Sequence, residues 1–184
     1  MGHKNYLLLI ELFYTVGAVI AILWFARKKI YDHLLECVLV YALLSAYLYF
    51  EYRAVFYTPT FILVLVILAV LTHTLLGECV DLYHKSMVFD RYLHLGGSFS
   101  FALFSYSIIH HLLRPVGLPW LYVALFVAAL GMAIGVVFEI MEFVHDVRSP
   151  QKPVSQHGLK DTDTDLIFNT IGSVLAGIAS IFIF

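Results

Sequence analysis

The sequence has little charge. Asp, Glu, Lys and Arg make up 13% of its 184 residues, whereas a soluble domain averages about 25%. Hydrophobic residues reach 61%, against about 45–50% in soluble proteins. They come in blocks long enough to cross a bilayer, so the class is an integral membrane protein, and the length suits a single transmembrane domain over residues 1–184. No basic patch is present, which argues against a nucleic-acid partner.

Cysteine is also scarce. Cys37 and Cys79 are far apart in the chain, and neither belongs to a Cys-x-x-Cys motif or a His cluster. We interpret both as buried small residues and not as disulfide partners or thiolate ligands. The sequence lacks internal repeats and low-complexity linkers, and its first apolar run lacks a cleavage signature, so that run is expected to be a retained helix.

Six apolar runs are close to the length that a bilayer requires, about 20 residues for a helix. The sequence therefore predicts an all-α integral membrane protein, a bundle of about six transmembrane helices. The predicted helices are residues 6–25, 34–50, 58–76, 92–113, 118–145 and 163–184.

Lys and Arg in the short connections predict the orientation, because they favour the cytoplasmic side. Eight lie on one side and three on the other. The first group is Arg27, Lys28, Lys29, Lys85, Arg91, Arg148, Lys152 and Lys160, and the second is Lys4, Arg53 and Arg114. The bias predicts a multi-pass protein of the cell (inner or plasma) membrane with both termini outside.

Acidic residues gather at the end of the fifth predicted helix. Glu139, Glu142 and Asp146 stand at i, i+3 and i+7, so three carboxylates share one helix face. A charged side chain near the centre of a membrane helix costs about 2.5–3.5 kcal/mol or more. The apolar runs hold almost no Lys or Arg to pair with them. A metal ion, a shared proton or a basic side chain reaching in from the interface could compensate these charges.

A second pair begins the fourth predicted helix. Asp90 and His94 stand at i and i+4, the spacing of two ligands on one helix face, and carboxylate with imidazole suits Zn, Mn or Fe. Arg91 could neutralise a charge or bind an anion. The alternative is an acid favoured by the helix dipole beside an interfacial histidine.

A third group enters the last predicted helix. Asp161, Asp165 and Asn169 stand at i, i+4 and i+8 on one face. A role in capping the helix explains Asp161 well and Asp165 less well. Asn169 lies deeper in the membrane than Asp165 and is expected to need a polar partner there. The residues Gly172, Ser173, Ala176 and Gly177 are expected to give a smooth face for close helix packing.

His73, near the end of the third predicted helix, is either a core histidine or a ligand or proton carrier. The predicted topology brings the ends that carry these polar groups to the cytoplasmic side. We therefore expect them to form one site facing the cytoplasm.

These motifs resemble those of the YjdF-like family of small inner-membrane proteins, a family of unknown function. The resemblance rests on Phe89-Asp90-Arg91-Tyr92-Leu93-His94-Leu95, Phe138-Glu139-Ile140-Met141-Glu142-Phe143 and Asp161-Thr162-Asp163-Thr164-Asp165. It covers roughly the C-terminal two thirds of the chain, and Leu95 and Asp163 depart from its pattern. More distantly, the chain looks like the VanZ-like membrane proteins, which are linked to glycopeptide resistance. Neither resemblance implies a settled reaction.

The first functional hypothesis is a metal-dependent hydrolase or transferase that acts on a lipid or lipid phosphate. One or two divalent ions (Zn, Mn, Fe or Mg) would activate water, and Glu142 would act as general base, with His73 and Arg91 as further catalytic groups. The expected metal ligands are Asp90, His94, Glu139, Glu142, Asp161 and Asp165, with Asn169 and Asp146 as other polar residues of the site.

Two other classes stay open. Intramembrane acids and histidines also serve proton- or divalent-cation-coupled transporters, although the outer halves of the last three predicted helices look nearly featureless. A buried polar cluster can instead fix packing in a non-catalytic membrane partner or sensor. Membrane lipids are the expected partners, and the sequence leaves a homodimer open.

Overall fold

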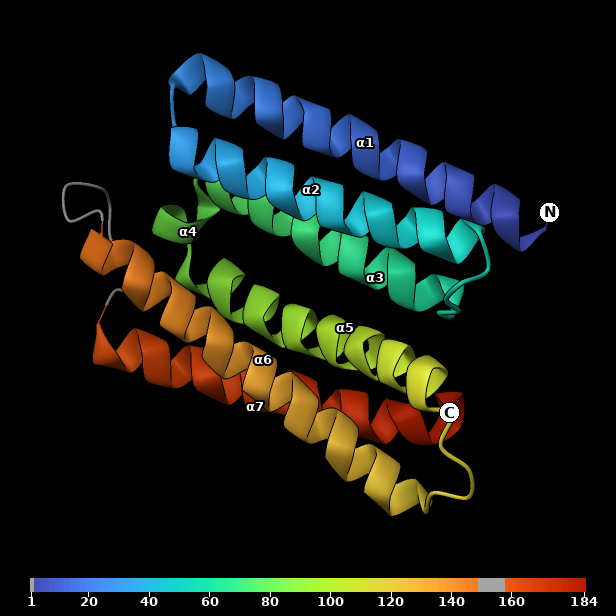
Figure 1. Cartoon of the computed structure of the whole chain (residues 1–184). Coiled ribbons are helices and arrows are strands. Elements are labelled where there is room, and N and C mark those ends of the chain that lie inside the picture. Colours follow the sequence, from blue (N-terminus) through green and yellow to red (C-terminus); the bar gives the residue numbers. More distant parts are fainter. Residues whose placement is uncertain (1, 149–157) are drawn as a thin grey trace. The chain divides into compact units, whose positions relative to one another are not determined.

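The computed structural model describes residues 2–148 and 158–184, and all regular secondary structure within them is helical (Figure 1). Its contacts divide the chain into two compact units, Met1–Asp81 and Leu82–Phe184. The first unit contains α1 (His3–Lys28), α2 (Tyr31–Tyr52), α3 (Thr60–Leu71) and the π-helix η1 (Thr72–Cys79). The second contains α4 (Leu82–Lys85), α5 (Met87–Leu113), α6 (Trp120–Arg148) and α7 (Leu159–Ile183).

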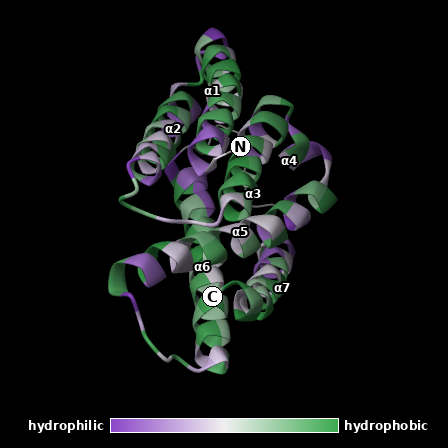
Figure 2. Ribbon diagram, turned by 90° about the vertical axis from the view of Figure 1, so that its right-hand side faces the viewer, coloured by the Kyte–Doolittle hydropathy of each residue, from purple (hydrophilic) through white to green (hydrophobic). Residues whose placement is uncertain are grey.

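The prediction of an all-helical membrane bundle is confirmed. Five of the described helical segments are long and apolar enough to cross a membrane, namely α1, α2, Thr60–Cys79, α6 and α7. Helix α5, which we also expected to span, has 27 residues but is less apolar because serines, paired glycines and histidines interrupt it. Hydrophobic residues dominate most of the long helices (Figure 2).

The predicted boundaries agree with the helices to within a few residues, and most of the helices are longer than predicted. The third predicted helix differs in kind, because its regular α-helix ends at Leu71 and continues as the π-helix to Cys79. π-Helical turns are rare and are frequently found at functional sites. The one-turn helix α4 was not predicted.

In the first unit, α1 packs against both α2 and α3. A buried carboxylate joins their ends: Glu51, 2% exposed, accepts a 2.9 Å hydrogen bond from the backbone N–H of Thr58. Its Oε1 also lies 3.3 Å from Nε2 of His3. Glu51 thus ties the start of α1 and the approach to α3 to the end of α2. Cys37 and Cys79 are free thiols, and both are only half-buried, whereas we had expected them to be buried.

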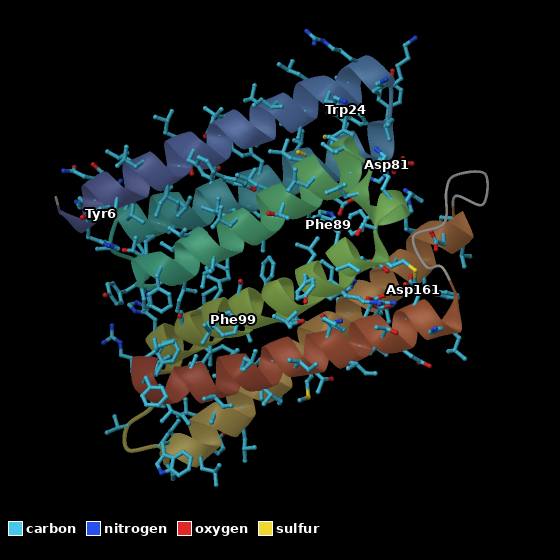
Figure 3. All side chains as sticks on the ribbon, turned by 180° about the vertical axis from the view of Figure 1, so that it is seen from behind. Tyr6, Trp24, Asp81, Phe89, Phe99 and Asp161 are labelled. Carbon is cyan, nitrogen blue, oxygen red and sulfur yellow. The ribbon has the colours of Figure 1, made fainter. Side chains whose placement is uncertain are left out.

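In the second unit, α5, α6 and α7 pack against one another. Helices α5 and α7 run in the same direction and α6 runs against them, so the start of α5, the end of α6 and the start of α7 meet at one end (Figure 1). Figure 3 labels Phe89 and Asp161 at this end and Phe99 farther along α5.

Small residues allow this packing. A Cβ added to Gly172 would collide with the backbone carbonyl oxygen of Leu95 on α5, and one added to Gly177 would lie 2.5 Å from that of Ala124 on α6. The predicted close-packing face of the last helix is confirmed.

Candidate metal centre

The site begins at the first turn of α5. The hydroxyl of Ser86 caps this helix by accepting a hydrogen bond from the backbone N–H of Phe89 at 3.2 Å. The cap starts the helix at Met87, which places Asp90 in its first turn and His94 one turn later. Nε2 of His94 lies 3.4 Å from Oδ1 of Asp90. The predicted i, i+4 pair is therefore formed.

The end of α6 supplies two more carboxylates. Oε1 of Glu139 lies 3.7 Å from Nδ1 of His94, and Oε1 of Glu142 lies 3.8 Å from its Nε2. Both ring nitrogens of His94 thus face carboxylates. The imidazole stands between acids from two different helices.

The first turns of α7 complete the cluster with Asp165. Ligand atoms of Asp90, His94 and Asp165 lie within 4.8 Å of one another, and those of His94, Glu139 and Glu142 form a second such group. His94 belongs to both. We call Asp90, His94, Glu139, Glu142 and Asp165 the five-residue cluster.

The spacing within the cluster is longer than that of hydrogen bonds. Direct N–H···O bonds have heavy-atom distances of about 2.7–3.2 Å, whereas the three His94 contacts measure 3.4, 3.7 and 3.8 Å. Two ligand atoms that each lie about 2.1 Å from a shared tetrahedral or octahedral ion are about 3.0–4.2 Å apart. The three His94 distances fall within this range, and the ligand atoms of each group as a whole lie within 4.8 Å of one another.

Burial differs across the cluster. Asp90, Glu139 and Asp165 are buried, and Asp165 is only 2% exposed. Its Oδ1 has no hydrogen-bond partner among the described residues. The side chain of Glu142 is 26% exposed, so the cluster has three enclosed carboxylates and a more accessible fourth.

A polar pair lies one turn deeper. The hydroxyl of Ser98 on α5 donates a 2.6 Å hydrogen bond to Oδ1 of Asn169 on α7. A Cβ added to Gly135 of α6 would lie 2.6 Å from Cγ of Asn169, so this glycine makes room for the amide. Asn169 was predicted to need a partner, but neither Ser98 nor Gly135 was singled out. The small-xxx-small spacing of Gly131 and Gly135 is the signal that could have indicated this contact.

A comparison with protein families decides what kind of protein carries this cluster. The model of the family described as "Predicted membrane protein (DUF2238)" matches residues 8–184. The chain belongs to the DUF2238 family. The YjdF-like resemblance is compatible with this membership, whereas no match supports the VanZ-like one.

One curated relative of this DUF2238 protein is an uncharacterized protein of Thermotoga maritima. It is 35% identical over 105 residues, which are 56% of this chain and 53% of the relative. The chain thus spans about half the length of the curated relative that it matches. No solved structure matches the chain.

Other predicted site residues of the DUF2238 chain lie around the five-residue cluster or away from it. Asp161 is buried one turn before Asp165 on α7, and Asp146 is partly exposed four residues after Glu142 on α6. Neither belongs to the two ligand groups. His73 lies in η1 of the first unit, so its part in the site stays a prediction.

Two basic residues used in the predictions are Arg91 and Lys152. Arg91 follows Asp90 on α5, and its Nε is buried without a hydrogen-bond partner among the described residues. Lys152, which we used to predict the orientation, lies outside the described residues. The orientation of the chain and of the site stays a prediction.

Proposed function

We propose that this membrane protein binds a divalent metal ion at the five-residue cluster and uses it to hydrolyse, or transfer a group from, a lipid or lipid phosphate. One observation carries the proposal. Donor atoms from three helices come within 4.8 Å of one another in two groups that share His94, and among them the buried Asp165 has a carboxylate oxygen without a hydrogen-bond partner in the described part of the chain. Buried charges are normally paired or coordinate metals.

The donor set favours a hard ion. Four carboxylates and one imidazole with no thiolate suit Mn, Fe or Mg, and also Zn, whose sites commonly include His and carboxylate. Asp90, His94 and Asp165 would form one ligand group, and Glu139 on α6, which faces the other ring nitrogen of His94, would orient the imidazole. Asp161 would act as an outer ligand or support Asp165 from the preceding turn.

Glu142 is the proposed general base, because it is the most accessible carboxylate of the cluster and lies beside His94. It would take a proton from water as the water oxygen attacks phosphorus, the bond to the alcohol oxygen breaks, and the proton passes to that leaving oxygen. The metal ion would supply Lewis acidity. Arg91, with its unpartnered Nε, would hold a phosphate oxygen.

The test uses purified protein in mild detergent, stripped of metal and reloaded with Mn²⁺, Mg²⁺ or Zn²⁺. Phospholipids and isoprenoid phosphates in mixed micelles are offered as substrates, and released phosphate or head group is measured. The proposal expects metal-dependent release that is lost in Asp90→Asn. Release that is unaffected by metal removal, or none with any substrate and ion, would contradict it.

A proton- or divalent-cation-coupled transporter is the second candidate. One observation favours it: the buried polar face of α7 continues beyond the cluster through Asn169 and Ser173 to Ser180. We had expected the outer halves of the last three helices to be nearly featureless. Against it, Ser173 and Ser180 donate to carbonyls of their own helix, as packing serines do. Uptake of Mn²⁺ or protons into liposomes that contain the protein would favour transport.

The third candidate, a non-catalytic membrane partner or sensor, would bind metal without turnover or flux. The predicted cytoplasmic position of the site is part of the proposal. It predicts that a cysteine placed at Asp163, in the first turns of α7, is labelled by impermeant maleimide in inverted vesicles and not in intact cells.

A further inference from the structure

His3, at the start of α1, stands between a hydroxyl group and a carboxylate. Its Nδ1 lies 3.4 Å from the hydroxyl oxygen of Thr60 at the start of α3, and its Nε2 lies 3.3 Å from Oε1 of Glu51 near the end of α2. Three helices of the first unit thus contribute one side chain each. Hydroxyl, imidazole and carboxylate in this order are the parts of an activated nucleophile, its base and the group that orients the base.

Glu51 determines which nitrogen of His3 can act as the base. Its side chain is 0% exposed, and the backbone N–H of Thr58 fixes its Oε1 with a 2.9 Å hydrogen bond. Because a carboxylate only accepts hydrogen bonds, it favours the tautomer of His3 that carries the hydrogen on Nε2. The lone pair of Nδ1 then faces the hydroxyl of Thr60. Contacts between a nucleophile and its base are often long before substrate binds and shorten in the complex.

Thr60 lies where a lipid ester can reach it. It is the first residue of α3 and is only partly buried. The segment Thr60–Cys79 is long and apolar enough to cross a membrane, so its first residue lies at the boundary between head groups and acyl chains, which is the depth of lipid ester groups. The backbone N–H groups of Thr60 and Phe61 open this helix and have no acceptor within it. Such groups stabilise negative charge on a carbonyl oxygen.

The surface beside Thr60 suits an acyl chain. Tyr57, three residues before it, and Phe61, directly after it, are both exposed aromatic side chains. The ring of Tyr57 also lies beside the imidazole of His3, with 5.7 Å between the ring centroids. An apolar chain can therefore contact these rings while its ester group meets the hydroxyl. The substrate class that fits is a fatty acyl ester.

We propose that Thr60 is a nucleophile that accepts an acyl group from a fatty acyl ester, with His3 as general base and Glu51 as a positioning residue. The hydroxyl oxygen of Thr60 bonds to the ester carbonyl carbon, and its proton passes to Nδ1 of His3. The bond from that carbon to the alcohol oxygen breaks, and the alcohol leaves with this proton. Water then attacks the acyl-threonine and gives a proton to His3, the fatty acid leaves, and the proton returns to Thr60. This site uses the first unit alone and is separate from the five-residue cluster.

The test uses full-length protein in mild detergent with a chelator, so that the proposed metal centre contributes nothing. The probe is a p-nitrophenyl ester of a fatty acid in mixed micelles. Released p-nitrophenol gives the rate, and mass spectrometry detects the acyl group on the peptide that contains Thr60. The main variant is Thr60→Val, which keeps the branched shape and removes the hydroxyl. Thr15→Val is the matched control, because the hydroxyl of Thr15 contacts Glu11 and Tyr41 of the same unit instead of a histidine.

We expect the acyl group on Thr60 in the parent and in Thr15→Val, whereas Thr60→Val should lose both the adduct and the release of p-nitrophenol. Release that persists in folded Thr60→Val overturns the proposal. A parent protein that forms no adduct and releases no p-nitrophenol also overturns it and leaves the proposed metal site standing. If Thr60→Val does not fold, Thr60→Ser decides: it keeps the hydroxyl and should be acylated at position 60, and the absence of this adduct overturns the proposal.

Two further variants separate catalysis from a role in tying the helices together. His3→Ala should slow release about 10²–10⁴-fold, the usual contribution of a general base, and added imidazole should restore part of the rate. A folded His3→Ala protein without this rescue overturns the role of His3. Glu51→Gln keeps a side-chain oxygen for Thr58 but no longer fixes the tautomer of His3, so it should lower kcat and leave KM unchanged. A parental kcat in Glu51→Gln overturns the role of Glu51.

Discussion

The backbone carbonyl oxygen of Leu95 on α5 lies against Gly172 on α7, so closely that a Cβ at position 172 would overlap it. Leu95 directly follows His94, and Gly172 lies two turns beyond Asp165. The contact holds the two helices at the separation at which His94 and Asp165 share a ligand group. The geometry of the candidate metal centre therefore depends on a glycine outside it.

Replacing Gly172 with Val should separate α5 and α7. Overpacking a close contact costs typically about 1–3 kcal/mol, which would appear as a lower unfolding midpoint in detergent and as weaker Mn²⁺ binding. Gly97→Ala is the matched control, because nothing lies within 4 Å of a Cβ there, and Ala is the better helix former. Equal midpoints for Gly172→Val and Gly97→Ala would contradict the packing role.

Replacing His94 with Leu should destabilise the metal-free protein. His94 contacts the carboxylates of Asp90, Glu139 and Glu142, and removing one partner of a buried ionic group typically costs about 3–5 kcal/mol. Denaturant unfolding in detergent measures the loss. Adding Asp90→Asn to the His94→Leu protein removes one carboxylate charge and should restore part of the lost stability. A His94→Leu protein as stable as the parent would show that these contacts do not hold the helices together.

Replacing Glu142 with Gln should lower turnover and leave metal binding largely intact. Glu142 is more exposed than the other carboxylates of the cluster, so its amide should leave most Mn²⁺ affinity in place. A general base contributes typically about 10²–10⁴-fold to rate. The rate at which the metal-loaded protein releases phosphate or head group from its lipid substrate should therefore fall by about that factor. Full turnover in Glu142→Gln, with metal bound, would assign the base to another residue.

A fourth prediction concerns the first unit. Glu51→Leu removes the acceptor for the buried N–H of Thr58, and an unsatisfied buried donor costs about 1–3 kcal/mol. Glu51→Gln keeps a side-chain oxygen for this bond and should lose less stability. Thermal unfolding of the two variants in the same detergent compares them. A Glu51→Gln protein that is as unstable as Glu51→Leu would mean that the charge, and not the hydrogen bond, matters.

Hydropathy was sufficient to predict the helical membrane class and five of the spanning-length helices, because a helix that crosses a bilayer needs a long apolar run. The i, i+4 and i, i+3 spacings of Asp90, His94, Glu139 and Glu142 likewise placed their side chains on shared helix faces. The alternation of helix directions then predicted that the ends carrying Asp90, Glu139 and Asp165 meet. Five of the six residues that were expected to bind metal lie in the two groups whose donor atoms come within 4.8 Å of one another, and their binding of a metal stays a prediction.

Other features of the structure could not be predicted from the sequence. Ser98 bonds across to Asn169, whereas Ser100 and Ser107 on the same helix bond back to their own carbonyls, and nothing local in the sequence distinguishes them. The sequence around His73 also did not indicate that this segment is π-helical. Glu51 belongs to no local sequence motif, because its partners Thr58 and His3 come from different segments.

The metal content of the purified protein tests the central claim most directly. Protein prepared in mild detergent without chelator would be compared with the Asp90→Asn/Asp165→Asn variant by elemental analysis, before and after divalent ions are added back. The account predicts one or two equivalents of Mn, Fe, Zn or Mg in the parent and loss of this metal in a variant that still folds. A parent without metal even after addition, or a folded variant that keeps its metal, would contradict it.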